Sequence, residues 1–300
     1  MSKVYSKAAL SFEAQVALLQ SRGMQIADVA AAISTLKRVS YYRLSAYWYP
    51  FRSAHDKFGS DATFERAVWL YEFDRRLRLL ALDAIERVEI ELRTSVTYVL
   101  GHKYGALALE DAARFRPGFD HLKWRRENLL PEIERSADKE SFLIHFRTNY
   151  LGFPSIPIWM ASEVMSLGTL SRLMKGMIAD DQNAVLARWG LHHTVAESWF
   201  HCIAYVRNVC AHHARLWNRD LAIKPMIPKK DPSWDAIVNN RRVFSVLCML
   251  RQLTRDHGAG DDWSRAATAL LREMDGKVAY QNAMGMPPTW SETRFWKSTT

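Results

Sequence analysis

The residues best suited to chemistry are concentrated in one short segment of the chain. Residues 201–221 read HCIAYVRNVCAHHARLWNRDL and mix basic, amide and apolar side chains. The basic and amide side chains belong to His201, Arg207, Asn208, His212, His213, Arg215, Asn218 and Arg219. Apolar spacing predicts one helix from Val195 to about Asp220, so each side chain can be placed by the angle at which it leaves the helix.

A projection at about 100° per residue divides this predicted helix into a polar stripe and an apolar face. Relative to Arg207, the stripe lies at about 80–140° and contains His201, Asn208, His212, Arg215 and Arg219. The apolar face carries Val206, Val209, Leu216 and Trp217. His213 projects at about 240°, within the apolar face. The projection therefore favours His212 as a catalyst and His213 as a packing residue.

Arginine, an amide and histidine on one face suit phosphodiester chemistry on RNA. The 2′-hydroxyl of RNA is a nucleophile within the substrate, so the protein need only transfer protons and stabilise charge on the phosphate. Arg207 would neutralise the phosphate, His212 would act as general base or acid, and Asn208 would position one of them. DNA lacks the hydroxyl and would be a poor substrate.

Two other interpretations of the same residues stay open. A basic helix face that carries histidines is also typical of a surface that only binds nucleic acid or an acidic partner. A metal site could use His201, His212 or His213, but the sequence has neither an HExxH motif nor a nearby carboxylate cluster. We therefore expect no metal and no cofactor.

Composition restricts the class of protein. The 300 residues are 48% hydrophobic, which is enough for a substantial core and excludes a disordered chain. The 41 Lys and Arg against 32 Asp and Glu leave a formal charge of +9, which favours a polyanionic partner such as nucleic acid. The three cysteines form no CxxC pair, which fits a reducing compartment. The sequence shows no export signal and no membrane-spanning run, so we expect a cytoplasmic protein.

Helical spacing through most of the chain predicts an all-α fold. The longest predicted helix runs from Thr63 to Leu100, where Phe73, Leu77, Leu80, Ala84 and Val88 form an apolar stripe. Other helices are expected at 11–36 with a break at Gly23, 122–135 with a break at Pro131, 140–150, 160–177, 181–189, 195–220 and 242–256. We expect an N-terminal helical and aromatic segment at 1–60 packed on the core, a helical core at 61–256 and an irregular C-terminal tail at 257–300.

The segment RNVCAHHARLWNR resembles the signature of the AbiD/AbiF-like abortive-infection proteins, a branch of the HEPN superfamily. That signature is Arg, then a polar residue, then His after four to six intervening positions. Arg207, Asn208 and His212 match it with four intervening residues, and His213 would match with five. The resemblance extends to LKRVSYYRLSAYWYPF, YEFDRRLRLLALDAIERVEIELR, PIWMASEVMSLGTLSRL and MGMPPTWSETRFW, and so covers nearly the whole chain.

This resemblance implies an HEPN-like antiparallel helical bundle with an N-terminal helical extension. Members are usually dimers in which two Arg/His motifs face each other across one cleft, and the active members are metal-independent ribonucleases. We therefore expect a homodimeric endoribonuclease of an anti-phage abortive-infection system, with RNA as substrate. The alternative is a non-catalytic RNA-binding or toxin–antitoxin interaction module that uses the same basic face. An antitoxin protein or RNA is a further candidate partner.

Residues outside this segment are secondary candidates. Glu86, Glu89 and Arg93 share one face of the predicted long helix and could orient Arg207 or His212, or they could form a solvated ion-pair face. The predicted RNA-binding set comprises His201, Arg215, Asn218, Arg219 and, from the aromatic segment, Arg43. The neighbours of Arg43, which are Tyr41, Tyr42, Tyr47 and Trp48, would either stack on exposed bases or pack helices together.

Overall fold

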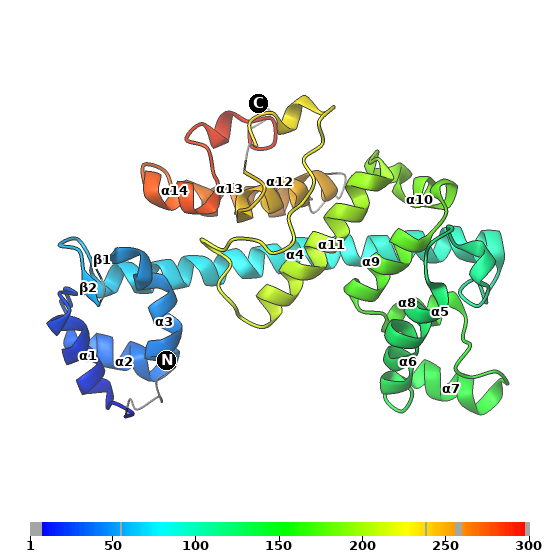
Figure 1. Ribbon diagram of the computed structural model, residues 1–300, viewed down its shortest axis with the longest axis horizontal. Coiled ribbons are helices and arrows are strands. Elements are labelled where there is room, and N and C mark those ends of the chain that lie inside the picture. The colour runs from blue at the N-terminus through cyan, green and yellow to red at the C-terminus, as the bar shows by residue number, and fades with distance from the viewer. Residues whose placement is uncertain (1–7, 55, 238, 256–259, 298–300) are drawn as a thin grey trace, which may run out of the picture. The chain divides into compact units, whose positions relative to one another are not determined.

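A computed structural model describes residues 8–54, 56–237, 239–255 and 260–297, and the chain divides into two compact units (Figure 1). The first unit ends at Leu77 and the second begins at Arg78, so the division lies within the longest helix, α4 (Phe64–Tyr104). The boundary expected near residue 60 lies in the loop that precedes α4, whereas the two units divide within α4. The described residues are mainly helical, which confirms the predicted all-α fold class.

The N-terminal unit consists of short capped helices and the first part of α4. Its elements are α1 (Phe12–Ser21), α2 (Val29–Val39), α3 (Tyr41–Trp48), the 3-10 turn η1 (Tyr49–Phe51) and the antiparallel strands β1 (Arg52–Ala54) and β2 (Lys57–Phe58). Tyr47 and Trp48 are buried, and the Tyr47 hydroxyl donates to the buried Asp74 carboxylate at 2.6 Å. These two aromatic residues therefore pack helices together, whereas Tyr42 is 90% exposed.

The second part of α4 is the central packing element of the C-terminal unit. Ala84 and Val88 of the predicted apolar stripe are fully buried, and the buried Leu92 and Val96 continue it at steps of four residues. The helix ends at Tyr104, four residues beyond the predicted end. There the Lys103 ammonium (2.5 Å) and the Tyr104 hydroxyl (2.8 Å) both donate to the carboxylate of Asp181. This carboxylate is buried and belongs to α10 (Ala179–Leu186), so it fixes α10 against the end of α4.

The region after α4 forms several helices, with an interruption of the α-helix next to Pro131. Its elements are η2 (Ala112–Arg114), α5 (His121–Trp124), the π-helical turn η3 (Arg125–Leu129), α6 (Leu130–Ser136) and α7 (Ser141–Asn149). Pro131 lies at the start of α6, directly after the π-helical turn. Proline normally clashes with the carbonyl four residues earlier, and the wider π turn relieves that clash, so the expected break takes the form of a π-helical turn and not of a loop.

A serine divides the segment that was expected to form one helix at 160–177. The structure has α8 (Ile158–Val164) and α9 (Leu167–Gly176) there. The Ser166 side chain accepts a hydrogen bond from the Thr169 amide at 3.2 Å and so caps α9. The next elements are α10, the 3-10 turn η4 (Ala187–Trp189) and α11 (His193–Ala211). Helix α11 packs closely on α9, and the two lie side by side in Figure 1.

The expected irregular tail contains helices. The last elements are η5 (Pro232–Trp234), α12 (Val243–Leu253), α13 (Gly260–Arg272), α14 (Val278–Met284) and η6 (Trp290–Glu292). Helix α13 buries Trp263, Ala267 and Leu271 at four-residue steps, and the Trp263 indole donates to the Leu80 carbonyl of α4 at 2.8 Å. The prediction of an irregular tail is therefore wrong for α13 and α14, because this apolar stripe packs on the core. No helix in the described part of the chain is long and apolar enough to cross a membrane.

Candidate functional site

Helix α11 ends at Ala211, about nine residues before the predicted end. The amides of His213 and Ala214 donate to the carbonyls of Cys210 and Val209, each at 2.9 Å, and His213 has a left-handed backbone with φ of 55°. This pair of bonds around a left-handed residue is the Schellman motif that terminates many helices. Glycine usually occupies the left-handed position, so a sequence with histidine there gives no stop signal.

The early end of α11 removes the basis for distinguishing the two histidines. His212 is the C-terminal cap of the helix and His213 follows it with a left-handed backbone, so the projection of a continuous helix does not hold for His213. Both side chains are exposed. The prediction that His213 packs in the apolar face is therefore wrong. Both His212 and His213 remain candidates for the histidine of the motif.

Asn208 lies in the last turn of α11 and Arg207 directly precedes that turn; both side chains are exposed. The Arg207 guanidinium donates to the Asn208 amide oxygen at 3.3 Å. The backbone carbonyl of Asn208 accepts a hydrogen bond from the backbone amide of His212 at 3.0 Å. Asn208 is therefore bonded directly to the residue that caps the helix. A cation, an amide and two histidines thus lie within seven consecutive residues at one helix end. These groups can neutralise a phosphate and exchange protons with a substrate hydroxyl.

His201 and Asn208 also line a groove of about 610 Å³ between α9 and α11. The opposite wall carries Arg172 and Lys175 of α9, which the sequence analysis did not select. Both cations are exposed, and they are three residues apart on the solvent side of an amphipathic helix. In the sequence alone, two cations three residues apart cannot be distinguished from any other exposed helix surface. Only the packing of α9 on α11 places them opposite His201.

The electrostatic environment of His201 reflects these cations. Burial lowers the pKa of His201 most strongly, and the charges of Lys175 and Arg172 lower it further. The imidazole is therefore mainly neutral at pH 7. The groove also contains Glu197, whose carboxylate is held at 3.1 Å by both the Arg116 guanidinium and the Gln182 amide.

The remaining predicted RNA-binding residues of the segment lie after the helix and do not form a stripe with His212. Arg215, Asn218 and Arg219 are half-buried. The Arg219 guanidinium donates to the Arg215 carbonyl at 2.5 Å, and the Asn218 amide oxygen accepts from Arg242 at 3.2 Å. The predicted stripe is wrong for these residues, because they lie after the end of α11 and do not continue its helical spacing. Their RNA contact stays a prediction.

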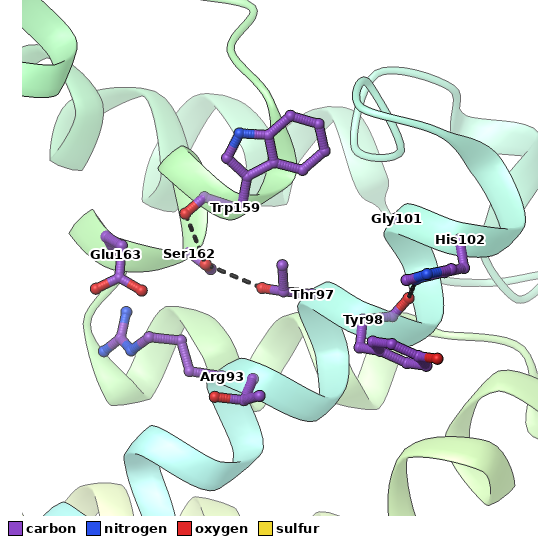
Figure 2. A pocket seen from close by; sticks show the side chains of 9 residues that line it. Arg93, Thr97, Tyr98, Gly101, His102, Trp159, Ser162 and Glu163 are labelled. Atoms are coloured by element: carbon purple, nitrogen blue, oxygen red, sulfur yellow. Dashed lines mark hydrogen bonds between the residues drawn. The ribbon is translucent and has the colours of Figure 1, made fainter.

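Arg93 lies at a second cavity, of about 410 Å³, between α4 and α8 (Figure 2). Its guanidinium donates to the Glu89 carboxylate at 2.6 Å and to the Met165 carbonyl at 3.0 Å, so it joins α4 to the link between α8 and α9. Glu86 is exposed on α4. These contacts give Arg93 and Glu89 a structural role, and orientation of the motif by Glu86, Glu89 or Arg93 stays a prediction. Arg43 is exposed on α3 in the N-terminal unit.

Comparison with known proteins gives one family match. The family described as Abi-like protein matches residues 34–218, more than half of the chain. The chain belongs to the Abi-like protein family. The matched range of this Abi-like protein includes α9, the whole of α11 and both candidate histidines, so the motif and both walls of the groove lie within the family's shared region. No curated protein and no solved structure matches the chain.

Proposed function

We propose that this chain is a metal-independent endoribonuclease of an abortive-infection system. The Arg207 guanidinium neutralises the scissile phosphate, and Asn208 holds the phosphate or the imidazole. The catalytic histidine, His212 or His213, removes the proton of the 2′-hydroxyl as it attacks phosphorus. The bond to the 5′-oxygen breaks, and that oxygen takes up a proton from the imidazolium or from solvent water. The products are a 2′,3′-cyclic phosphate and a 5′-hydroxyl, and no cofactor is needed.

The observation that carries this proposal is that Arg207, Asn208 and two histidines are all exposed within seven residues at one helix end. Membership of the Abi-like family supports a role in abortive infection. The cationic groove beside the motif supports a polyanionic substrate. An HEPN-like homodimer, in which two such helix ends share one cleft, completes the proposed site, because one copy supplies a single arginine for the phosphate.

The test is incubation of the purified protein with total RNA in excess EDTA, followed by mass spectrometry of the product ends. We expect cleavage with 2′,3′-cyclic phosphate ends. An Arg207→Ala variant and a His212→Ala/His213→Ala double variant, each purified in parallel, should leave the RNA intact. Cleavage by the double variant would point to a contaminating nuclease and contradict the assignment.

The competing function is a non-catalytic RNA-binding or toxin–antitoxin interaction module, which the exposed basic groove would also serve. A module of that kind would bind RNA with equal affinity before and after the histidines are replaced, and it would produce no cyclic phosphate at any protein concentration. Binding and product analysis on the same preparations therefore distinguish the two functions.

A further inference from the structure

The groove between α9 and α11 has an uncompensated positive charge. Among the described residues, no carboxylate forms an ion pair with Arg172 or Lys175. Glu197 is the carboxylate that lines the groove, and Arg116 and Gln182 already hold it. The other titratable lining residues are His201, which is mainly neutral at pH 7, and a tyrosine. Two free cations therefore determine the charge that a ligand meets.

The shape of the groove suits an extended ligand. Its α11 wall runs from Thr194 to Asn208, which corresponds to about 21 Å along a helix axis. Small residues of both helices, including Gly168 and Ala204, make room between the walls. The axes of two packed helices lie about 8–10 Å apart, so the surface groove that they flank is narrower than a double helix and suits a single strand.

The polar groups of the groove suit a sugar–phosphate backbone. Arginine and lysine bind phosphate oxygens, and amide and hydroxyl groups hydrogen-bond to phosphate and sugar. The Ser198 hydroxyl oxygen accepts the Met226 amide at 2.8 Å, which leaves the hydroxyl hydrogen available to donate. Asn208 ends the groove and is also part of the motif, so a strand in the groove leads directly to Arg207.

We propose that the α9–α11 groove binds the backbone of single-stranded RNA, with Arg172 and Lys175 as phosphate-binding residues that lead the strand to Arg207 and Asn208. The delivery of RNA for cleavage rests on the proposed function, whereas binding in the groove does not depend on it. An acidic polypeptide is the other polyanion that such a surface could take. The continuity of the groove with the motif favours RNA.

Binding is tested in the His212→Ala/His213→Ala background, where RNA is not cut. A fluorescein-labelled 12-nucleotide single strand is titrated by anisotropy at several salt concentrations, beside a blunt duplex of the same length. Arg172→Gln/Lys175→Gln is compared with a matched control, Arg135→Gln/Lys139→Gln. The control residues are exposed and form no ion pair among the described residues. Each pair removes two positive charges.

The groove variant should bind the single strand about tenfold or more weakly, and the slope of log affinity against log salt should fall by about 1.4, since each phosphate contact on a single strand contributes about 0.7. The control variant should keep affinity and slope. The duplex should bind more weakly than the single strand. An equal loss in both variants, or an unchanged slope in the groove variant, would overturn the proposal. Poly-glutamate that binds more tightly than RNA and loses affinity only in the groove variant would assign the groove to an acidic partner instead.

Cleavage is measured separately with the histidines intact. If groove binding holds and the wild-type protein does not cut RNA, the proposed function fails and the groove assignment stands. If the wild type cuts and the groove variant shows the wild-type kcat/KM and salt dependence, the groove assignment fails and the proposed function stands.

Discussion

His212 and His213 are adjacent in the chain but have opposite backbone conformations, with φ of −86° and 55° respectively. The first caps α11 and the second occupies the left-handed position of its Schellman motif. Non-glycine residues in left-handed conformations are strained, and strained residues are concentrated at functional sites. The conformation of His213 is thus itself a reason to test it as a catalyst beside His212.

The first prediction concerns which histidine transfers the proton. We expect His212→Ala to lower single-turnover cleavage by roughly 10² or more, because the His212 amide donates to the Asn208 carbonyl and so holds this residue one helical turn from the motif. His213→Ala should cleave at a rate within a few-fold of the wild type. The reverse pattern would assign catalysis to His213 and the five-residue spacing. Neither variant should unfold, since both side chains are exposed.

The second prediction concerns backbone strain at His213. We expect His213→Gly to be more stable than His213→Ala by about 1 kcal/mol, because both lose the imidazole and only glycine adopts the left-handed region without steric cost. Urea unfolding of the two variants measures the difference. The same pair of substitutions at His212, whose φ is −86°, is the control and should not favour glycine. An equal free energy of unfolding for the two His213 variants would contradict the assigned conformation.

The third prediction concerns the titration of His201. Burial, Lys175 and Arg172 lower its pKa from 6.5, so Lys175→Gln should raise this pKa while leaving it below 6.5, because burial is the largest cause. NMR titration of the imidazole measures the shift. A lowered pKa in the folded state means that the unfolded chain binds the proton first as pH falls. The contribution of His201 to the free energy of unfolding is therefore complete above about pH 6.5, and it declines as the pH falls toward the pKa of the folded state. An unchanged pKa in the variant would mean that Lys175 does not face His201.

The fourth prediction concerns the nucleophile. Cleavage should continue in EDTA, and a substrate with a 2′-deoxy or 2′-O-methyl group at the cut position should stay intact, because the attacking hydroxyl is absent or blocked. Gel analysis of matched oligonucleotides decides the point, with an unmodified strand as control. Cutting of the modified strand at the normal rate would exclude the internal nucleophile. Loss of activity in EDTA with recovery in Zn²⁺ or Mn²⁺ would support a metal mechanism.

The fifth prediction concerns assembly. We expect light scattering at micromolar concentration to give about twice the 34.6 kDa mass of one chain, because the proposed site needs two helix ends in one cleft. RNA cleavage by a mixture of Arg207→Ala chains and His212→Ala/His213→Ala chains is the measurement that tests whether the two copies share the site. A strict monomer that cuts RNA at full rate would contradict the shared cleft.

The sequence alone determined the features that depend on local periodicity. The apolar stripe of Phe73, Leu77, Ala84 and Val88 located α4, since a helical repeat is visible wherever one face is buried. The same repeat placed His201 and Asn208 on one face of α11, and the groove confirms that shared face. The motif of Arg207, Asn208 and histidine also led to the family, because its spacing can be read from the chain directly.

The tertiary structure decided which residues meet and where α11 ends. Arg172 and Lys175 face His201 because α9 packs on α11, and that contact depends on burial between segments that no local pattern encodes. The end at Ala211 depends on a left-handed histidine, where a sequence would normally show glycine. Arg93 joins Met165 across 72 residues of chain. Periodicity determines the faces of single helices, whereas the partners of those faces are fixed only when all helices pack together.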